Sequence, residues 1–168
     1  MTPSKIRAQC PGRYIHAAYA LALGLATGVI IRLLDMHTEN AGNIFSQLSV
    51  WILICTALAV FSANPRLAAL KAFAFCAGML VTYYLTAQLT GGVWSMSFAI
   101  GWAAVSLAAL PAGYIAWYAR GSGVMATAIG AGIIAVMLAV EWLLFDWLRV
   151  SDLFCAAACA LVVFYRKK

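Results

Sequence analysis

Charged side chains are scarce in this chain: they make up 10% of its 168 residues, whereas hydrophobic residues make up 65%. Soluble domains carry about a quarter charged residues, so this composition excludes a soluble domain. Acidic residues are the rarest charged group, with 5 against 11 Lys and Arg. The basic residues stand in short clusters at the ends of apolar blocks. They do not form the stripe with interleaved aromatics that is typical of nucleic-acid binding, so we expect no nucleic-acid partner.

Enzyme signatures are missing as well. The sequence has no nucleophile elbow, no paired metal-binding histidines and no Walker loop. We therefore expect no enzyme activity, no catalytic residues and no cofactor, although an intramembrane enzyme with scattered catalytic residues stays open. The five cysteines are an odd number, which predicts no disulfide framework. Cys155 and Cys159 share a helix face, but no further ligands converge on them, so we expect packing residues and no metal site.

What the chain has instead is a series of long apolar blocks separated by short polar breaks. An α-helix needs roughly 20 apolar residues to cross a hydrocarbon core of about 30 Å. The blocks therefore predict an all-α, polytopic membrane protein, a single bundle of six transmembrane helices embedded in the lipid bilayer. We expect the spans at 14–34, 44–63, 67–89, 95–119, 124–147 and 150–165. Residues 1–13 and 166–168 are then an N-terminal tail and a basic C-terminal tail, and Asn64-Pro65 separates the second span from the third.

The distribution of Lys and Arg predicts the orientation, because these residues in short loops stay on the cytoplasmic side. With the N-terminus inside, only Arg32 and Arg149 lie toward the outside, and all five acidic residues fall in the outer half. We therefore expect both termini in the cytoplasm and the protein in the plasma membrane. A five-span alternative would put the basic tail 166–168 outside. The last span is the shortest, with a length of about 24 Å at 1.5 Å per residue.

Two ionisable residues inside the spans are the best candidates for a binding site, because such residues usually face the bundle interior. Arg32 and Glu141 both stand about 26 Å above the cytoplasmic ends of their helices, at 1.5 Å per residue. The same outer level carries further polar and aromatic side chains: Gln47, Tyr83, Tyr84, Trp102 and Trp142. Together these seven residues predict a small-molecule site that opens to the external side. Arg32 would bind a carboxylate or phosphate, and Glu141 a cation or proton.

Structural alternatives to this site stay open. Arg32 and Glu141 could neutralise each other without a ligand, with Asp35 also paired to Arg32. The tryptophans and tyrosines could form an aromatic belt at the membrane interface. Small residues spaced by four predict helix contact faces, either within the bundle or with a partner membrane protein. These residues are Gly24, Gly28, Ala104, Ala108, Ala112, Ala126, Gly130, Ala131, Ala135, Ala139, Ala156 and Ala160.

Several segments carry a resemblance to a known family. The segments 42–51 and 111–114, Gly78 followed by Tyr83-Tyr84, and the helix with Glu141 resemble a family of small bacterial membrane proteins of unknown function. The resemblance covers most of the chain. It implies a six-helix fold in a bacterial plasma membrane and supplies no catalytic residues.

In size, span count and predicted cavity the chain is also similar to the S components of energy-coupling factor transporters. Those subunits contact the transporter scaffold through small residues spaced by four on the first helix, and Ala18, Ala22 and Ala26 would be the matching positions. The sequence thus predicts a small-molecule binding or transport protein, and the similarity implies a subunit like an S component. The alternative is a non-catalytic membrane subunit that scaffolds or regulates a partner membrane protein.

Overall fold

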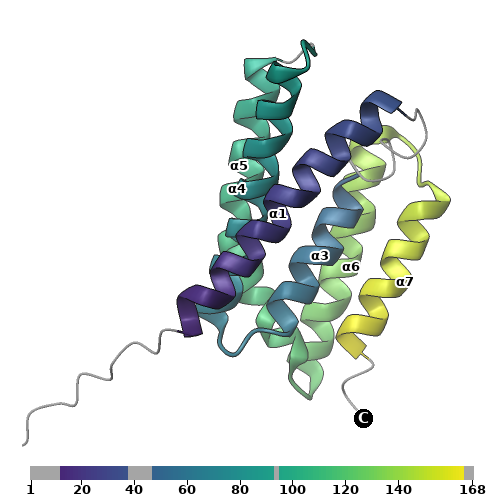
Figure 1. The fold of residues 1–168 in the computed structure, drawn as a ribbon. Coiled ribbons are helices and arrows are strands. Elements are labelled where there is room, and N and C mark those ends of the chain that lie inside the picture. Colours follow the sequence, from purple (N-terminus) through teal and green to yellow (C-terminus); the bar gives the residue numbers. More distant parts are fainter. Residues whose placement is uncertain (1–11, 38–46, 93–94, 165–168) are drawn as a thin grey trace, which may run out of the picture.

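A computed structural model describes residues 12–37, 47–92 and 95–164 of the chain (Figure 1). Within these residues the protein is all-helical and contains six α-helices, which confirms the predicted fold class at this level. The helices are α1 (Gly12–His37), α3 (Leu48–Val60), α4 (Pro65–Leu89), α5 (Met96–Ala116), α6 (Val124–Phe145) and α7 (Val150–Phe164), with a short 3-10 helix η1 (Trp117–Arg120) after α5. The predicted start of the second span at residue 44 and most of the two predicted tails lie outside the described residues.

Four segments are long and apolar enough to cross a membrane: Ala17–His37, Pro65–Leu89, Met96–Arg120 and Val124–Leu144. The other two helices are shorter, with 13 residues in α3 and 15 in α7. At 1.5 Å per residue they are only about 20 Å and 22 Å long. Large apolar side chains such as Leu143 and Phe154 are exposed on the outer surface of the bundle. A protein with this surface and these helices has the character of a polytopic membrane protein.

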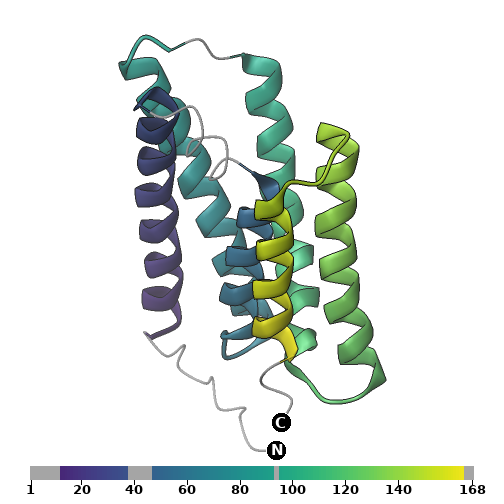
Figure 2. The same ribbon diagram turned by 90° about the vertical axis from the view of Figure 1, so that its right-hand side faces the viewer.

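Helix α3 lies at the centre of the bundle, where it contacts α4, α5, α6 and α7. Helix α1 lies at the periphery and packs mainly on α4, while α7 packs on α3 and α6 (Figures 1 and 2). The first turn of α1 and the last turn of α7 lie at the same end of the bundle (Figures 1 and 2). Helices α5 and α6 follow each other in the chain but make little contact with each other.

The contact between α1 and α4 depends on glycines, as the small-residue spacing of the first span predicts. A Cβ added at Gly24 would overlap the carbonyl oxygen of Phe75, and one at Gly28 would overlap that of Met79. Gly78 on α4 approaches the backbone of α1 in the same way. The hydroxyl of Thr82 donates to the carbonyl oxygen of Leu25 at 2.9 Å across this contact. The Gly24 and Gly28 face is therefore an internal packing face.

The predicted break at Asn64-Pro65 is confirmed, because Asn64 is the N-cap of α4 and accepts from the Leu67 amide at 2.8 Å. Pro65 follows at the first helical position, where its missing N–H costs nothing. The carbonyl oxygen of Ser62 is tied to η1, since it accepts from Trp117 Nε1 at 2.9 Å and Arg120 Nη1 at 2.8 Å. This contact joins the α3–α4 turn to the end of α5.

Several helix ends differ from the expected boundaries by one to three residues; α1, for example, runs to His37 rather than to residue 34. Helix α3 ends at Val60 rather than at residue 63, and the turn to α4 follows directly. Helix α6 ends at Phe145 rather than at residue 147, because Asp146 adopts a left-handed backbone with φ of 59°. A left-handed residue directly after the last turn terminates a helix and lets its amide bond back to an earlier carbonyl, here that of Trp142.

Candidate functional site

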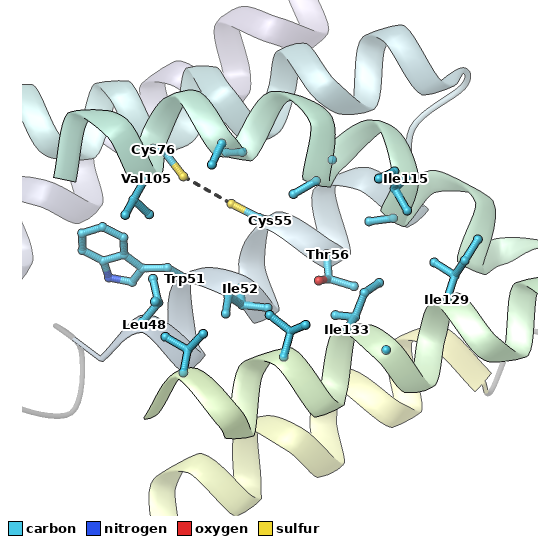
Figure 3. A pocket seen from close by; sticks show the side chains of 18 residues that line it. Leu48, Trp51, Ile52, Cys55, Thr56, Cys76, Val105, Ile115, Ile129 and Ile133 are labelled. Atoms are coloured by element: carbon cyan, nitrogen blue, oxygen red, sulfur yellow. Dashed lines mark hydrogen bonds between the residues drawn. The ribbon is translucent and has the colours of Figure 1, made fainter. Parts of the chain in front are cut away.

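An apolar cavity of about 550 Å³ lies between α3, α5 and α6, with part of its wall from α4 (Figure 3). This volume is within the range of small-molecule sites, roughly 300–1,000 Å³. Most of the lining is Ile, Val, Leu, Ala and Gly, and the lining residues whose side chains carry a nitrogen, oxygen or sulfur atom are Trp51, Thr56, Cys55 and Cys76. Such a lining favours an apolar ligand, because a charged group placed there would lose its hydration without gaining a counter-charge.

The cavity opens sideways, between α5 and α6. Its α5 wall includes Val105 and Ala112 and its α6 wall includes Gly132 and Val136, all of which are partly open to the surroundings of the bundle. The gap exists because α5 and α6 make little contact along their lengths. Small residues on both walls keep the space unfilled, and a Cβ added at Gly132 would meet no atom within 4 Å. In a bilayer this opening faces the lipid chains.

One end of the cavity is closed by an aromatic pair. The ring of Trp51 lines the cavity, and the ring of Trp102 packs against it with centroids 5.1 Å apart and planes tilted by 46° (Figure 3 shows Trp51). Tilted aromatic pairs at this distance are favourable and hold both rings in place. Trp102 is therefore the one residue of the predicted site that supports this cavity.

A second feature is a buried polar cluster where the first turns of α3 and α7 meet α6. Glu141 on α6 is 1% exposed, and its Oε1 accepts from the backbone amide of Ser49 at 2.7 Å. Ser49 is the second residue of α3, where the amides have no partner within the helix. A carboxylate at that position satisfies a free amide and also interacts favourably with the positive end of the helix dipole. Glu141 thus caps a neighbouring helix.

Asp152 lies in the first turn of α7 and caps the start of its own helix. Its Oδ2 accepts from the backbone amide of Arg149 at 2.8 Å, and its Oδ1 accepts from the Ser49 hydroxyl at 2.8 Å. Gln47 completes the cluster, with its side-chain amide oriented so that both the nitrogen and the oxygen are paired. The nitrogen donates to Ser151 Oγ at 2.9 Å and to Asp152 Oδ1 at 3.1 Å, and the oxygen accepts from Arg149 Nη1 at 2.7 Å. The bonds connect the start of α3 to the start of α7, and they use polar groups that would otherwise be buried without partners.

Arg32 lies in a third group, at the contact of α1 with the end of α4. Its guanidinium is 5.7 Å from the centre of the Tyr83 ring, and the Tyr83 hydroxyl donates to Asp35 Oδ2 at 3.0 Å. The ring of Tyr84 meets that of Tyr83 edge-on, with centroids 5.5 Å apart. A Cβ at Gly92 would overlap Arg32 Nη2, so the absence of a side chain there leaves room for the guanidinium.

The structure does not bring the predicted site residues together. Arg32 belongs to the α1–α4 group and Glu141 to the α3–α6–α7 cluster, and no ion pair or hydrogen bond joins these two described side chains. Gln47 lies with Glu141, Tyr83 and Tyr84 lie with Arg32, and Trp102 lies at the cavity. Trp142 points away from the bundle with 56% of its surface exposed.

Sequence reasoning missed the thiol pair in the cavity wall. Cys55 and Cys76 lie on adjacent helices with their sulfur atoms 3.5 Å apart. The turn at 61–64 indicates that α3 and α4 are antiparallel neighbours. Counting equal numbers of residues from that turn would place Cys55 opposite Leu70, because such counting ignores the axial offset between the helices. The partners of Glu141 were missed for a similar reason, since nothing in the sequence says which helix start lies beside it.

No family model matches the chain, and no curated protein or solved structure is significantly similar to it.

Proposed function

We propose that this chain is a small-molecule binding or transport protein of the membrane, and that its ligand is apolar and occupies the cavity between α3, α5 and α6. The observation that carries this proposal is the cavity itself, with its volume of about 550 Å³ and almost wholly apolar lining. Its lateral opening between α5 and α6 favours a ligand that arrives through the bilayer. This route differs from the external one that Arg32 and Glu141 predict.

The polar cluster supports the same choice of site. The groups that could bind a polar ligand, Glu141 and Asp152, already accept hydrogen bonds from the starts of α3 and α7. A ligand there would have to displace these bonds and leave buried amides unpaired, at a cost of about 1–3 kcal/mol for each. The apolar cavity needs no such displacement.

We further propose that all six helices belong to the membrane domain, with both termini in the cytoplasm of a bacterial cell and the bundle in its plasma membrane. The excess of Lys and Arg at one end of the predicted spans supports this orientation. So does the position of the start of α1 and the end of α7 at one end of the bundle (Figure 2). Helices α3 and α7 are short for a bilayer, and the capping cluster at their starts would satisfy amides that lie below the membrane surface.

The binding experiment uses purified protein in lipid nanodiscs and a polyene fatty acid whose absorption overlaps tryptophan emission. Binding in the cavity would place the polyene beside Trp51 and quench tryptophan fluorescence by energy transfer. Gly132→Leu fills the cavity from its α6 wall, and we expect it to weaken the affinity at least about tenfold, equivalent to 1.4 kcal/mol. Gly101→Leu is the matched control, because Gly101 is exposed on α5, does not line the cavity and also has nothing within 4 Å of an added Cβ.

Equal affinity in the Gly132→Leu and Gly101→Leu variants would place any binding outside the cavity and contradict the proposal. Native mass spectrometry of the gently purified protein supplies the second readout. An apolar metabolite retained by the wild type and the Gly101→Leu variant but lost from Gly132→Leu would identify the natural ligand class.

One observation favours the alternative, a non-catalytic subunit that stabilises or regulates a partner membrane protein. Ala131, Ala135 and Ala139 form a row of small residues on α6 that is exposed, in contrast to Gly24 and Gly28, which are covered by α4. Exposed rows of small residues let another helix approach closely in lipid. A stoichiometric partner that co-purifies from native membranes, and that Ala135→Leu releases, would support this alternative.

A further inference from the structure

The cavity wall carries two thiols that face each other. Cys55 comes from α3 and Cys76 from α4, and Figure 3 shows their sulfur atoms directed toward one another across the helix contact, 3.5 Å apart. Both residues line the cavity. Cys76 is buried, and the Cys55 thiol lies 4.0 Å from the carbonyl oxygen of Ala72. The thiols therefore lie between two helices, and both can be reached from the cavity.

This spacing is suited to two-electron chemistry. A disulfide has its sulfur atoms about 2.05 Å apart and requires the two Cβ atoms to be about 3.5–4.5 Å apart. Two sulfur atoms that are already 3.5 Å apart need to approach by only about 1.5 Å to form this bond. Cys55 and Cys76 are therefore positioned to join α3 and α4 through a disulfide.

The surroundings define which oxidant could reach the pair. Water-soluble oxidants and disulfide-exchange proteins approach from an aqueous phase, whereas this cavity opens toward the lipid and is lined by apolar side chains. A suitable reactant is thus soluble in the bilayer, flat enough to pass between α5 and α6, and able to accept two electrons. Quinones have all three properties. The ring of Trp51 at the cavity end offers a face on which a quinone ring can stack.

We propose that the cavity binds a lipid-soluble quinone and that Cys55 and Cys76 reduce it. In this step both S–H bonds break and a bond forms between the two sulfur atoms. Two electrons and two protons pass to the two carbonyl oxygens of the quinone, which leaves as the quinol. This inference rests on the proposed function, because it assigns a substrate class to the same cavity.

The test uses the full chain in lipid nanodiscs, with Cys10, Cys155 and Cys159 replaced by alanine so that only the pair remains. The reduced protein is mixed with decylubiquinone, and samples are quenched with acid and alkylated with N-ethylmaleimide under denaturing conditions. Intact mass then counts free thiols, and peptide mapping identifies a link between Cys55 and Cys76. We expect both thiols to be lost together, at least about tenfold faster than with an equally concentrated membrane-impermeant oxidant, because binding holds the reactants together.

Two variants connect the reaction to the cavity. Gly132→Leu should slow the loss of thiols about tenfold, while Gly101→Leu should react like the parent, since only Gly132 lines the cavity. Copper phenanthroline, a small oxidant, checks that the thiols of both variants still lie close enough to join. Cys76→Ala should leave Cys55 free and alkylated after exposure to the quinone.

The outcomes separate this inference from the proposed function. If the polyene fatty acid binds in the cavity but decylubiquinone leaves both thiols free, the quinone inference is overturned and the proposed function stands. Equal oxidation rates in Gly132→Leu and Gly101→Leu would also overturn it, because the reaction would then not pass through the cavity. If neither the polyene nor the quinone binds, both proposals fall.

Discussion

Glu141 shows how one buried carboxylate can be explained without a ligand. In a membrane interior an isolated carboxylate is costly, and its presence usually indicates function. Here Oε1 accepts from the Ser49 amide at 2.7 Å, so the charge lies at the positive end of α3. The alternative in which Arg32 neutralises Glu141 gains no support from the contacts of either residue. The backbone amide at the start of α3 stabilises the buried carboxylate instead.

Removing this acceptor should destabilise the fold. We expect Glu141→Ala to lower the free energy of unfolding by about 1–3 kcal/mol, because the buried Ser49 amide loses its partner. Glu141→Gln keeps a side-chain oxygen at the same place and should lose less than half as much. The free energies can be measured by reversible SDS denaturation in mixed micelles, followed by tryptophan fluorescence.

The control for this comparison is Asp146→Asn, which removes an exposed acid at the same end of α6. Asn adopts the left-handed backbone of this position readily, so the change should stay within about 0.5 kcal/mol. If Glu141→Ala is no less stable than Glu141→Gln, the capping bond does not contribute and the role assigned to Glu141 is wrong.

The helices of this protein are held together by two different devices. Between α1 and α4, glycines allow the two backbones to approach, and Thr82 bonds to the carbonyl of Leu25 across the contact. Between α3, α6 and α7, side chains cap the helix starts and so connect the elements. Close backbone approach is the usual means of association in lipid, where the hydrophobic effect does not drive helices together. The polar device is used at the starts of α3 and α7, the two helices that are shorter than the others.

The first device predicts a contrast between two glycines. Gly24→Ala places a Cβ onto the carbonyl oxygen of Phe75, so α1 must move away from α4, and we expect a loss of about 1–3 kcal/mol in unfolding free energy. Gly132→Ala meets no atom within 4 Å and should be neutral or slightly stabilising, since Ala favours the helix. The same SDS titration measures both. A Gly24→Ala variant as stable as Gly132→Ala would show that α1 is free to shift and that the glycine contact is not required.

Across the whole molecule, the sequence predicted where the helices lie along the chain, but it did not predict which helices pack against each other. The lengths of the apolar blocks predicted six helices, and the structure contains six in the described residues. Asn64-Pro65 predicted the break before α4, and the spacing of Gly24 and Gly28 predicted a contact face; the structure contains both. The same counting placed Arg32 and Glu141 at equal height. Height, however, does not determine which neighbours a helix has, and α1 packs on α4 while α6 packs on α3 and α7. The cavity was unpredictable for the same reason, since it results from the poor contact between α5 and α6.

The proposed six-span topology predicts that both ends of the chain lie on the cytoplasmic side. An even number of spans returns the chain to its starting side, as the positions of the start of α1 and the end of α7 at one end of the bundle suggest (Figure 1). Fluorescent-protein and alkaline-phosphatase reporters, fused in parallel before Met1 and after Lys168, should both report cytoplasmic ends. The helices α3 and α7 decide the result, because each is shorter than the roughly 30 Å hydrocarbon core. If one of them fails to cross, the reporter after Lys168 becomes external while the one before Met1 stays inside, and the six-span topology is wrong.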